Sequence, residues 1–353
     1  MSAKMRAGHI GCGSRGTSDI ESMRGLLDFE MVCDLDPVRA EKTQTIYGFK
    51  KATTDWRTLI HDPSVEFISI CLPPDLNYEI VMEASHLAKP IWVEKPMDWC
   101  LTRAVEMVQV CKQFSTPIAV GQNYRYSDIA MHVKELIGQG EIGEPFFANL
   151  EHMFRSDNIF LDWISRSGRY LSSGVCVHYY DLFRFFLDDD ADTVYARTFQ
   201  APYRQVQAKE KGIPSNNCDT TCIASVAFKK GTVVQLTCSE DIQGGDAYWP
   251  DHYTISGSEG SVFVNAAERF PLQIYRSSKG YREPVHTAVA SSTDPGKTHI
   301  ESRRLIADYL AALENGLPAP TSGLDNLKSL AIAEATYLSA ESGMPVKVDD
   351  LLP

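Results

Sequence analysis

The first part of the chain, up to about residue 120, alternates short apolar runs with amphipathic stretches of helical spacing. Several of the apolar runs are hydrophobic at nearly every position, which is typical of strands covered on both faces. Predicted strands occupy residues 6–11, 30–36, 65–74, 90–96 and 116–123. Predicted helices occupy residues 17–27, 37–48, 77–88 and 101–114. This alternation indicates βαβ units built around a parallel sheet.

The pattern changes after Asn123, and from Asp192 onward several strand-like runs follow one another without long helices between them. Predicted strands occupy residues 144–154, 222–240, 252–265 and 271–277, and the second of these runs turns back on itself as a hairpin at residues 229–231. Predicted helices occupy residues 127–140, 299–316 and 323–343, and the segment 169–186 has apolar residues at helical spacing from Val175 to Phe186. The polar stretch 201–219 is typical of a surface loop. We therefore predict an α/β domain over residues 1–123. An α+β domain with a large, mostly antiparallel open sheet follows over residues 124–353.

The charge composition of the chain indicates which kinds of molecule it binds. The 353 residues carry a net charge of −12, from 34 basic and 46 acidic side chains, without any block of like charge. This balance argues against nucleic acid and anionic membranes as partners and favours small ligands. The nine cysteines form no CxxC pair, the N-terminus lacks a signal-peptide run, and no apolar stretch approaches the ~20 residues of a membrane span. We expect a cytoplasmic protein, and no histidine spacing predicts a metal site.

A glycine-rich turn joins the first predicted strand to the first predicted helix. The segment HIGCGSRG holds the pattern G-x-G-x-x-G at Gly11, Gly13 and Gly16. In dinucleotide-binding units, the first glycine allows a tight turn, the second lets the backbone approach the pyrophosphate, and the third permits close helix packing. Asp34 ends the next strand, 18 residues after Gly16, where an acid hydrogen-bonds the ribose hydroxyls. Together these residues predict a Rossmann domain.

The same acid bears on the choice of cofactor. A carboxylate at Asp34 repels the 2′-phosphate of NADP, and neither Leu35 nor Asp36 could bind that phosphate. NAD is therefore the expected cofactor. Arg15 and Arg39 are nearby cations, so NADP stays the alternative.

Lys95 lies in the segment WVEKP, at the carboxyl end of a predicted strand. Ligands of open α/β sheets bind at such ends, which would place Lys95 beside a nicotinamide. Here the chain resembles the glucose–fructose oxidoreductase/inositol dehydrogenase/MocA (Gfo/Idh/MocA) family nearly end to end. The resemblance is carried by GCGSRG, VCDLDPVRA, YGF, LPPDLNYEIVMEA, VEKP, NYRY, ELIGQGEIGEP, the segment around His178, GSEGSV and GMPVKV.

The resemblance implies both architecture and activity. It implies an NAD(P)-binding Rossmann domain, a second α/β domain with an open sheet, and NAD(P)-linked oxidation or reduction of sugars, polyols or cyclitols. It also implies a homodimer or homotetramer assembled through that sheet, and often a cis peptide bond at Lys95–Pro96.

The resemblance further assigns roles to individual residues. His178 would remove the hydroxyl proton in the oxidative direction, and Lys95 would stabilise the developing oxyanion, in a pocket between the domains. Substrate-binding roles fall on Tyr124, Arg125, Trp163, Arg166 and Asp181. Cofactor-binding roles fall on Gly11, Cys12, Gly13, Ser14, Arg15, Gly16, Asp34, Leu72, Pro73, Asn77, Glu94, Lys95 and Gln122.

Two departures from the family pattern matter. Asn77 stands where relatives usually carry a histidine, and the pattern D-x-G-x-H-x-x-D becomes Gly174, Cys176, His178 and Asp181. The acid four residues before the histidine is absent, and Asp181 is the remaining candidate partner one turn away. On one hypothesis His178 is still the base, completed by a carboxylate or water from elsewhere. On another the protein is a catalytically silent NAD-binding sensor, and a third is an NAD-using lyase, epimerase or glycosidase with transient oxidation.

Overall fold

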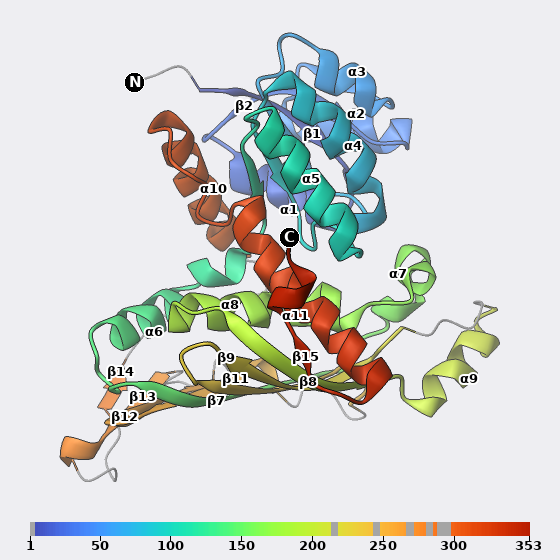
Figure 1. Cartoon of the computed structure of the whole chain (residues 1–353). Coiled ribbons are helices and arrows are strands. Elements are labelled where there is room, and N and C mark those ends of the chain that lie inside the picture. The colour runs from blue at the N-terminus through green and yellow to red at the C-terminus, as the bar shows by residue number, and fades with distance from the viewer. Residues whose placement is uncertain (1–3, 213–217, 243–247, 266–271, 280–284, 288–297) are drawn as a thin grey trace. The chain divides into compact units, whose positions relative to one another are not determined.

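The computed structural model describes all residues except 1–3, 213–217, 243–247, 266–271, 280–284 and 288–297 (Figure 1). Its internal contacts divide the chain into two units. The first unit contains Met1–Tyr126 and Pro295–Leu327, and the second contains Ser127–Asp294 and Lys328–Pro353. Residues 298–327, which the pattern groups with the second half of the chain, thus belong to the first unit.

The first unit contains a parallel sheet. Within the described residues it has six strands in the order β3-β2-β1-β4-β5-β6, and every pair runs parallel. The strands are β1 (Arg6–Ile10), β2 (Asp28–Cys33), β3 (Lys51–Thr53), β4 (Phe67–Ile70), β5 (Ile91–Val93) and β6 (Ile118–Val120). The strand order reverses between β1 and β4, which is where ligands bind in such sheets. The glycine turn follows β1 directly.

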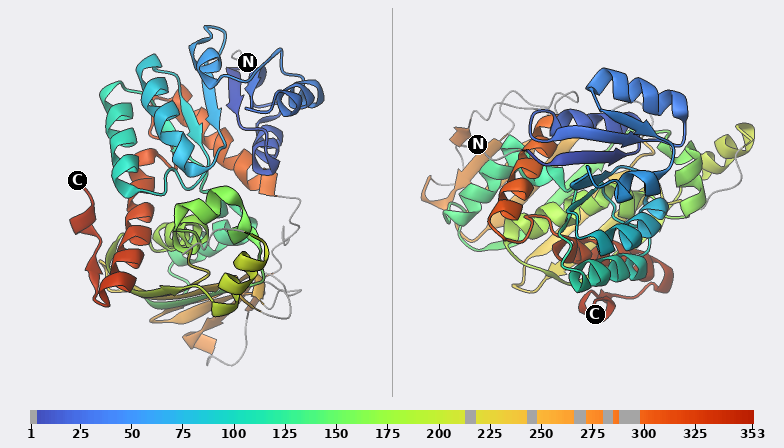
Figure 2. Two further views of the ribbon diagram at one scale, coloured as in Figure 1. Left: turned by 90° about the vertical axis from the view of Figure 1, so that its right-hand side faces the viewer. Right: turned by 90° about the horizontal axis from the view of Figure 1, so that it is seen from above.

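Helices cover both faces of this sheet (Figure 2). They include α1 (Ser14–Met23), α2 (Pro37–Tyr47), α3 (Trp56–His61), α4 (Asn77–Ala84) and α5 (Leu101–Gln113). The pattern missed β3 and α3, which have only three and six residues and are too short to show a period. It also misplaced the first helix, which spans Ser14–Met23 rather than residues 17–27. The remaining strands and helices predicted for this half are confirmed.

Helix α10 (Thr298–Glu314) belongs to this unit although it lies far along the chain. Its Leu305, Ile306 and Tyr309 are fully buried and pack in one cluster with Phe67 and Trp92. Each such side chain contributes about 1.5–3 kcal/mol by leaving water. The helix therefore supplies part of the core of the dinucleotide-binding unit.

The second unit is built on a mixed sheet that is mostly antiparallel, as predicted. Its described residues form nine strands in the order β14-β13-β12-β11-β7-β10-β9-β8-β15, and β7 and β10 are the parallel pair among them. The strands are β7 (Pro145–Met153), β8 (Ala191–Phe199), β9 (Thr221–Phe228), β10 (Val233–Ser239), β11 (Tyr248–Gly257), β12 (Gly260–Asn265), β13 (Leu272–Arg276), β14 (Val285–Thr287) and β15 (Val346–Lys347). The hairpin at residues 229–231 is confirmed by the pairing of β9 with β10.

Helices lie on one face of this sheet and leave the other face open (Figures 1 and 2). The covering helices are α6 (Asp128–Gly138), α8 (Val177–Leu187) and α11 (Gly323–Ser342), and a short helix, α7, spans Asp162–Ser167. The helices predicted over residues 127–140, 299–316 and 323–343 are confirmed. No helix among the described residues is long and apolar enough to cross a membrane.

The prediction of a surface loop over residues 201–219 is wrong for its first half. Residues Pro202–Glu210 form helix α9, with Pro202 at a position that helices accept. Its buried positions, Arg204 and Ala208, are one turn apart, but the larger of them is a charged side chain. An arginine at the buried position hides the apolar stripe by which helices are usually found. Residues 213–217 of this stretch lie outside the described residues.

Candidate active site

The glycine turn after β1 is lined by backbone atoms. Gly11 has a φ of 103°, and a Cβ atom there would lie 2.1 Å from the carbonyl oxygen of Cys71. A Cβ atom on Gly16 would lie 1.9 Å from the carbonyl oxygen of Gly11, so α1 packs directly on the turn. Apart from chain neighbours, no described atom lies within 4 Å of a Cβ built on Gly13. This space, and the N–H groups of α1 that no side chain caps, fit the pyrophosphate of a dinucleotide.

Asp34 lies directly after β2 and is held by the backbone. Its carboxylate accepts hydrogen bonds from the N–H groups of Cys12 (2.8 Å) and Asp36 (2.9 Å). It borders a cleft of about 200 Å³ at the carboxyl edge of the sheet. The cleft is lined by Ile10, Gly11, Cys33, Asp34, Leu35, Thr54, Trp56, Leu72, Asp75, Leu76, Glu79 and Ile80. An apolar cleft with acids and no lining cation suits an adenosine without a 2′-phosphate.

Arg15 and Arg39, the two cations that could favour NADP, are each paired with carboxylates. Arg39 lies 3.7 Å from Asp34 and 3.5 Å from Asp36. Arg15 lies 2.6 Å from Glu94 and 3.3 Å from Asp19, so its charge faces the interior of the unit. These pairs favour NAD, because a 2′-phosphate would have to compete with existing carboxylate partners.

The carboxyl ends of the other strands bring the remaining predicted cofactor residues to the same sheet edge. Leu72 and Pro73 follow β4, Glu94 and Lys95 follow β5, and Gln122 follows β6. Glu94 is buried, and its Oε2 accepts a hydrogen bond from the backbone N–H of Lys95 (3.2 Å). The peptide bond before Pro96 is cis, as expected from the resemblance.

Asn77 begins α4 at this edge. Its side-chain Nδ2 donates to the carbonyl oxygen of Met97 (3.0 Å), while its buried Oδ1 has no hydrogen-bond donor among the described residues. A buried acceptor without a donor is costly, and a bound ligand can satisfy it. The edge therefore fits a dinucleotide, with Asn77 offering an acceptor where a histidine is usual.

His178 lies in the first turn of α8, in the second unit. The residues before it, Leu171–Cys176, form a π-helix that includes Gly174, so the regular helix begins at Val177 rather than at Val175, where the helical spacing begins. Asp219 holds the start of this turn by accepting hydrogen bonds from the backbone N–H groups of Tyr170 and Ser172, at 2.8 and 2.9 Å. A π-turn is rare and is often found at functional sites.

Asp181 and Arg125 each form a hydrogen bond with a residue of α11. Asp181 is buried in the second unit, accepts a hydrogen bond from the Ser329 hydroxyl (3.0 Å) and lies 3.8 Å from Arg184. In the first unit, Arg125 donates to Asp325 (2.7 Å), and Tyr124 beside it is partly buried. The described contacts of Asp181 thus hold α8 against α11.

Trp163 and Arg166 lie on α7 in the second unit. Trp163 packs against a buried cluster of Ile159, Ile164, Tyr170 and Cys218. Arg166 has an exposed side chain and pairs with Asp162 at 3.0 Å. Tyr170 therefore connects α7 to the π-turn that leads to His178.

Tyr170 and Glu240 form a buried polar pair next to the π-turn. The Tyr170 hydroxyl donates to Glu240 (2.8 Å), which follows β10, and burial raises the pKa of Glu240 to about 7. Nearby, the hydroxyl of Tyr179 lies 2.6 Å from Nδ1 of His152 on β7. The start of α8 thus lies over the carboxyl ends of β7 and β10.

Two family models match the chain and show to which protein family it belongs. Residues 5–122 match the model described as "Oxidoreductase family, NAD-binding Rossmann fold". Residues 134–348 match "Oxidoreductase family, C-terminal alpha/beta domain", and these two matches together span most of the chain. The chain belongs to the Gfo/Idh/MocA oxidoreductase family. It is therefore an NAD-binding oxidoreductase.

Individual members of the Gfo/Idh/MocA family are similar to this chain over nine tenths or more of its length. The D-apiose dehydrogenase of Paraburkholderia graminis is 24% identical, over 97% of this chain and 89% of its own. The inositol 2-dehydrogenase of Rhizobium meliloti is 24% identical, over 98% of this chain and 99% of its own. A levoglucosan dehydrogenase solved with NADH and levoglucosan has a TM-score of 0.83 at 22% identity, covering 98% of this chain and 100% of that one. The similarity to the levoglucosan dehydrogenase structure shows that the two chains share a fold.

Several residues that shape the Gfo/Idh/MocA site here carry no sequence signal. Asp219 ends the predicted loop 201–219 and Glu240 ends the predicted strand 222–240, and nothing in their sequence surroundings marks these acids as buried. Asp19, on the buried face of α1, has its pKa raised by burial and by Glu94. Its spacing of four residues from Arg15 is the one signal that could have singled it out. Among the described residues no group of three metal-ligating side chains could hold a metal ion.

Proposed function

We propose that the protein is an NAD-dependent dehydrogenase acting on a hydroxyl group of a sugar, polyol or cyclitol. The observation that carries the proposal is a complete dinucleotide cradle in a chain that keeps both Lys95 and His178. An inert NAD binder needs no such acid/base pair. The names of the relatives, D-apiose and inositol dehydrogenases among them, support the substrate class.

Each residue has a defined task in the oxidative direction. His178 accepts the proton of the substrate hydroxyl, work that suits an imidazole with a pKa near ~6.5 and typically contributes ~10²–10⁴-fold. The ammonium group of Lys95 stabilises the oxyanion that develops on the same oxygen. NAD held by the glycine turn and Asp34 supplies the hydride acceptor. Tyr124, Arg125, Trp163 and Arg166 bind the remaining substrate hydroxyls, and Asp181 holds α8 in place.

A turnover screen tests the proposal. The purified protein would meet cyclitols, aldoses, keto-sugars and sugar acids with NAD and, separately, with NADP, and nicotinamide absorbance would report turnover. We expect turnover with NAD, a loss of about 10²-fold or more in kcat for His178→Ala, and unchanged activity for the surface control His61→Ala. NAD binding without turnover on any substrate would support the sensor alternative. Product formation without net NADH would support transient oxidation.

We further propose a homodimer or homotetramer assembled through the open face of the second sheet. Side chains alternate along each strand, and the face away from the helices carries large apolar residues that are exposed in the single chain. They are Phe147, Tyr195, Phe199, Ile223 and Phe263. An exposed apolar set of this kind is typical of an interaction surface.

We also place the protein in the cytoplasm. All nine cysteines lie in the described part of the chain and are free thiols, which suits a reducing compartment. Fractionation of the producing cell, with the protein detected in the cytoplasmic fraction, would check this assignment.

A further inference from the structure

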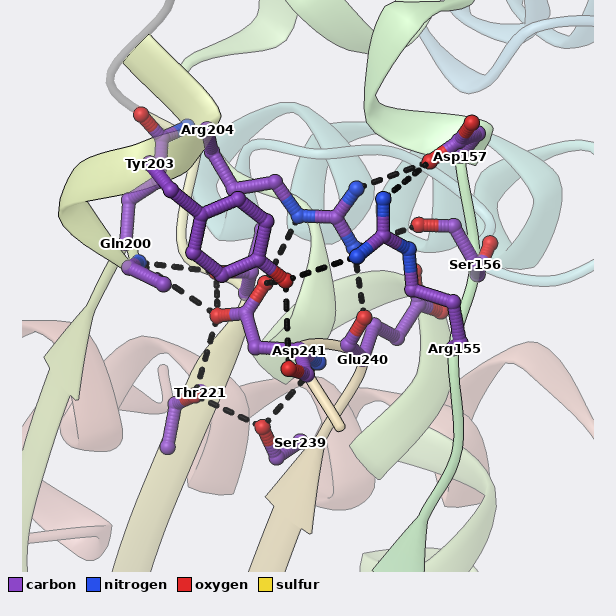
Figure 3. Close-up of polar contacts among 12 residues, drawn as sticks. Arg155, Ser156, Asp157, Gln200, Tyr203, Arg204, Thr221, Ser239, Glu240 and Asp241 are labelled. Carbon is purple, nitrogen blue, oxygen red and sulfur yellow. Dashed lines mark hydrogen bonds and ion pairs between the residues drawn. The ribbon is translucent and has the colours of Figure 1, made fainter. Parts of the chain in front are cut away.

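The fully buried Arg204 of α9 joins two loops at one edge of the second sheet (Figure 3). Its Nε donates to Asp241 (2.7 Å) and its Nη1 donates to Asp157 (2.8 Å). Its Nη2 donates to the carbonyl oxygens of Ser156 and Glu240, both at 2.6 Å. One guanidinium group thus fixes the loop after β7 and the loop after β10.

The loops after β7 and β10 leave the second sheet at the same edge. Strands β7 and β10 run parallel from Phe147 and Val233 to Met153 and Ser239, so their carboxyl ends meet at the same edge. The α8 segment that bears His178 begins over this edge. The loop after β7, which Arg204 holds, leads from this edge to α7 and then to the π-turn before His178.

Tyr203, the neighbour of Arg204, holds the first of these loops from a second direction (Figure 3). Its hydroxyl accepts a hydrogen bond from Nη1 of Arg155 (3.1 Å) and lies 3.1 Å from the carbonyl oxygen of Asp241. The Arg155 guanidinium also lies over the Tyr203 ring, 5.4 Å from its centroid. The first turn of α9 and the loop after β7 therefore form one connected piece.

The anchored loop continues into the segment that bears Trp163 and Arg166. Ile159, at its start, packs in one buried cluster with Ile164 of α7 and with Tyr170, which precedes the π-turn. A displacement of residues 155–161 would therefore move α7 and the start of α8 together.

A buried arginine is a costly way to attach a helix if stability alone is required. Taking a cation out of water is unfavourable unless several acceptors compensate, and apolar residues would serve as well or better. What the guanidinium fork adds is direction, because each of its hydrogen bonds specifies the position of one acceptor. Two of the four acceptors are backbone carbonyl groups, so the fork sets the path of both loops.

We propose that Arg204 is a positioning residue for the substrate, and that α9 fixes the loop over residues 155–167 in the shape that binds it. This inference rests on the proposed function, because it assigns the loop to a polyol or sugar substrate.

The first test compares Arg204→Met with a control on the same helix. Lys209→Met removes an exposed cation of α9 and should leave all parameters unchanged. For Arg204→Met we expect kcat/KM for the best polyol to fall by about 10- to 100-fold, mainly through KM, since small displacements of binding groups cost this much. The dissociation constant and stoichiometry of NADH, measured by fluorescence, should stay at the wild-type values. Tyr203→Phe should change KM in the same direction by a smaller factor.

Hydrogen exchange provides a readout that does not need turnover. Peptides covering residues 155–167 should exchange faster in Arg204→Met, while peptides of the glycine turn should not. Unchanged exchange in the peptides covering residues 155–167 would overturn the proposal. Faster exchange in these peptides together with an unchanged KM would also overturn it. Loss of NADH binding would indicate general misfolding. The variant Arg204→Met/Asp241→Asn would then be decisive, because it removes the buried charge of Asp241 and leaves Asp157 paired with Arg155 (3.3 Å). The same loss in that variant would overturn the proposal. If the wild type oxidises no polyol, the proposed function fails, while exchange still decides whether Arg204 anchors the loop.

Discussion

At the scale of single residues, Glu240 is the group whose chemistry depends most on its surroundings. It is completely buried, and its Oε1 accepts a hydrogen bond from Tyr170. Burial raises its pKa to about 7, an effect opposed by Tyr170 and, more weakly, by the charges of His152 and Arg204. A carboxyl group that keeps its proton close to neutral pH can donate as well as accept.

This pKa predicts how stability depends on pH. Between its ordinary value of 4.5 and about 7 the folded state binds more protons than the unfolded state, so the free energy of unfolding falls as pH rises through this range. The fall attributable to Glu240 is at most about 3 kcal/mol. Urea unfolding at pH 5 to 8 should show a steeper decline for the wild type than for Glu240→Gln. The exposed control Glu210→Gln should follow the wild type, and equal slopes in all three would contradict the assignment.

At the scale of elements, the π-turn before α8 depends on one acid from another element. Helix starts leave N–H groups without partners. Asp219, just before β9, accepts from three of them, on Tyr170 (2.8 Å), Leu171 (3.2 Å) and Ser172 (2.9 Å). The hydroxyl of Tyr337 on α11 donates to the same carboxylate (3.0 Å). The position of the His178 segment is thus specified by the sheet and by α11.

Removal of this carboxylate should destabilise the turn. We expect Asp219→Ala to lower the free energy of unfolding by roughly 2–4 kcal/mol, because several buried donors lose their acceptor. Asp219→Asn, which keeps one carbonyl oxygen, should lose less. Urea titration gives the stability, and kcat of the folded protein should fall further for the alanine variant. Asp350→Ala, on the exposed C-terminal segment, is the control; an alanine variant as stable as this control would refute the role.

At the scale of the whole molecule, the open face of the second sheet sets the expected assembly. This face carries polar residues such as Ser225 and Gln235 beside exposed apolar ones, among them Phe147, Ile223 and Phe263. A pleated face with both polar and apolar side chains suits a second copy of the same face, since most homo-oligomers are symmetric.

A charge placed on that face should prevent assembly. We expect Ile223→Glu to sediment as a monomer at concentrations where the wild type is a dimer or tetramer, because an unpaired carboxylate would be buried in the interface. Val38→Glu, at an exposed apolar position on α2, is the matched control and should assemble normally. Sedimentation velocity measures the mass directly, and a monomeric wild type would rule out the proposed interface.

The sequence by itself determined what depends on local chain geometry. The glycine turn with Asp34, the alternation of the parallel sheet and the hairpin at residues 229–231 follow from backbone requirements and period, which neighbouring residues encode. His178 and Lys95 stand out because their segments match a family pattern. Lys95 directly follows β5 and His178 lies in α8, while their catalytic roles stay predictions.

Only the tertiary structure decided which distant residues meet. Arg204 binds Asp157, 47 residues away, and Asp219 binds the turn at Tyr170, 49 residues away. Helix α10 joins the first unit from the far end of the chain. Such pairings depend on how whole elements pack, and a charged residue in a sequence gives no sign of whether it will be buried or solvated. Burial and the partners that compensate for it are properties of the assembled fold.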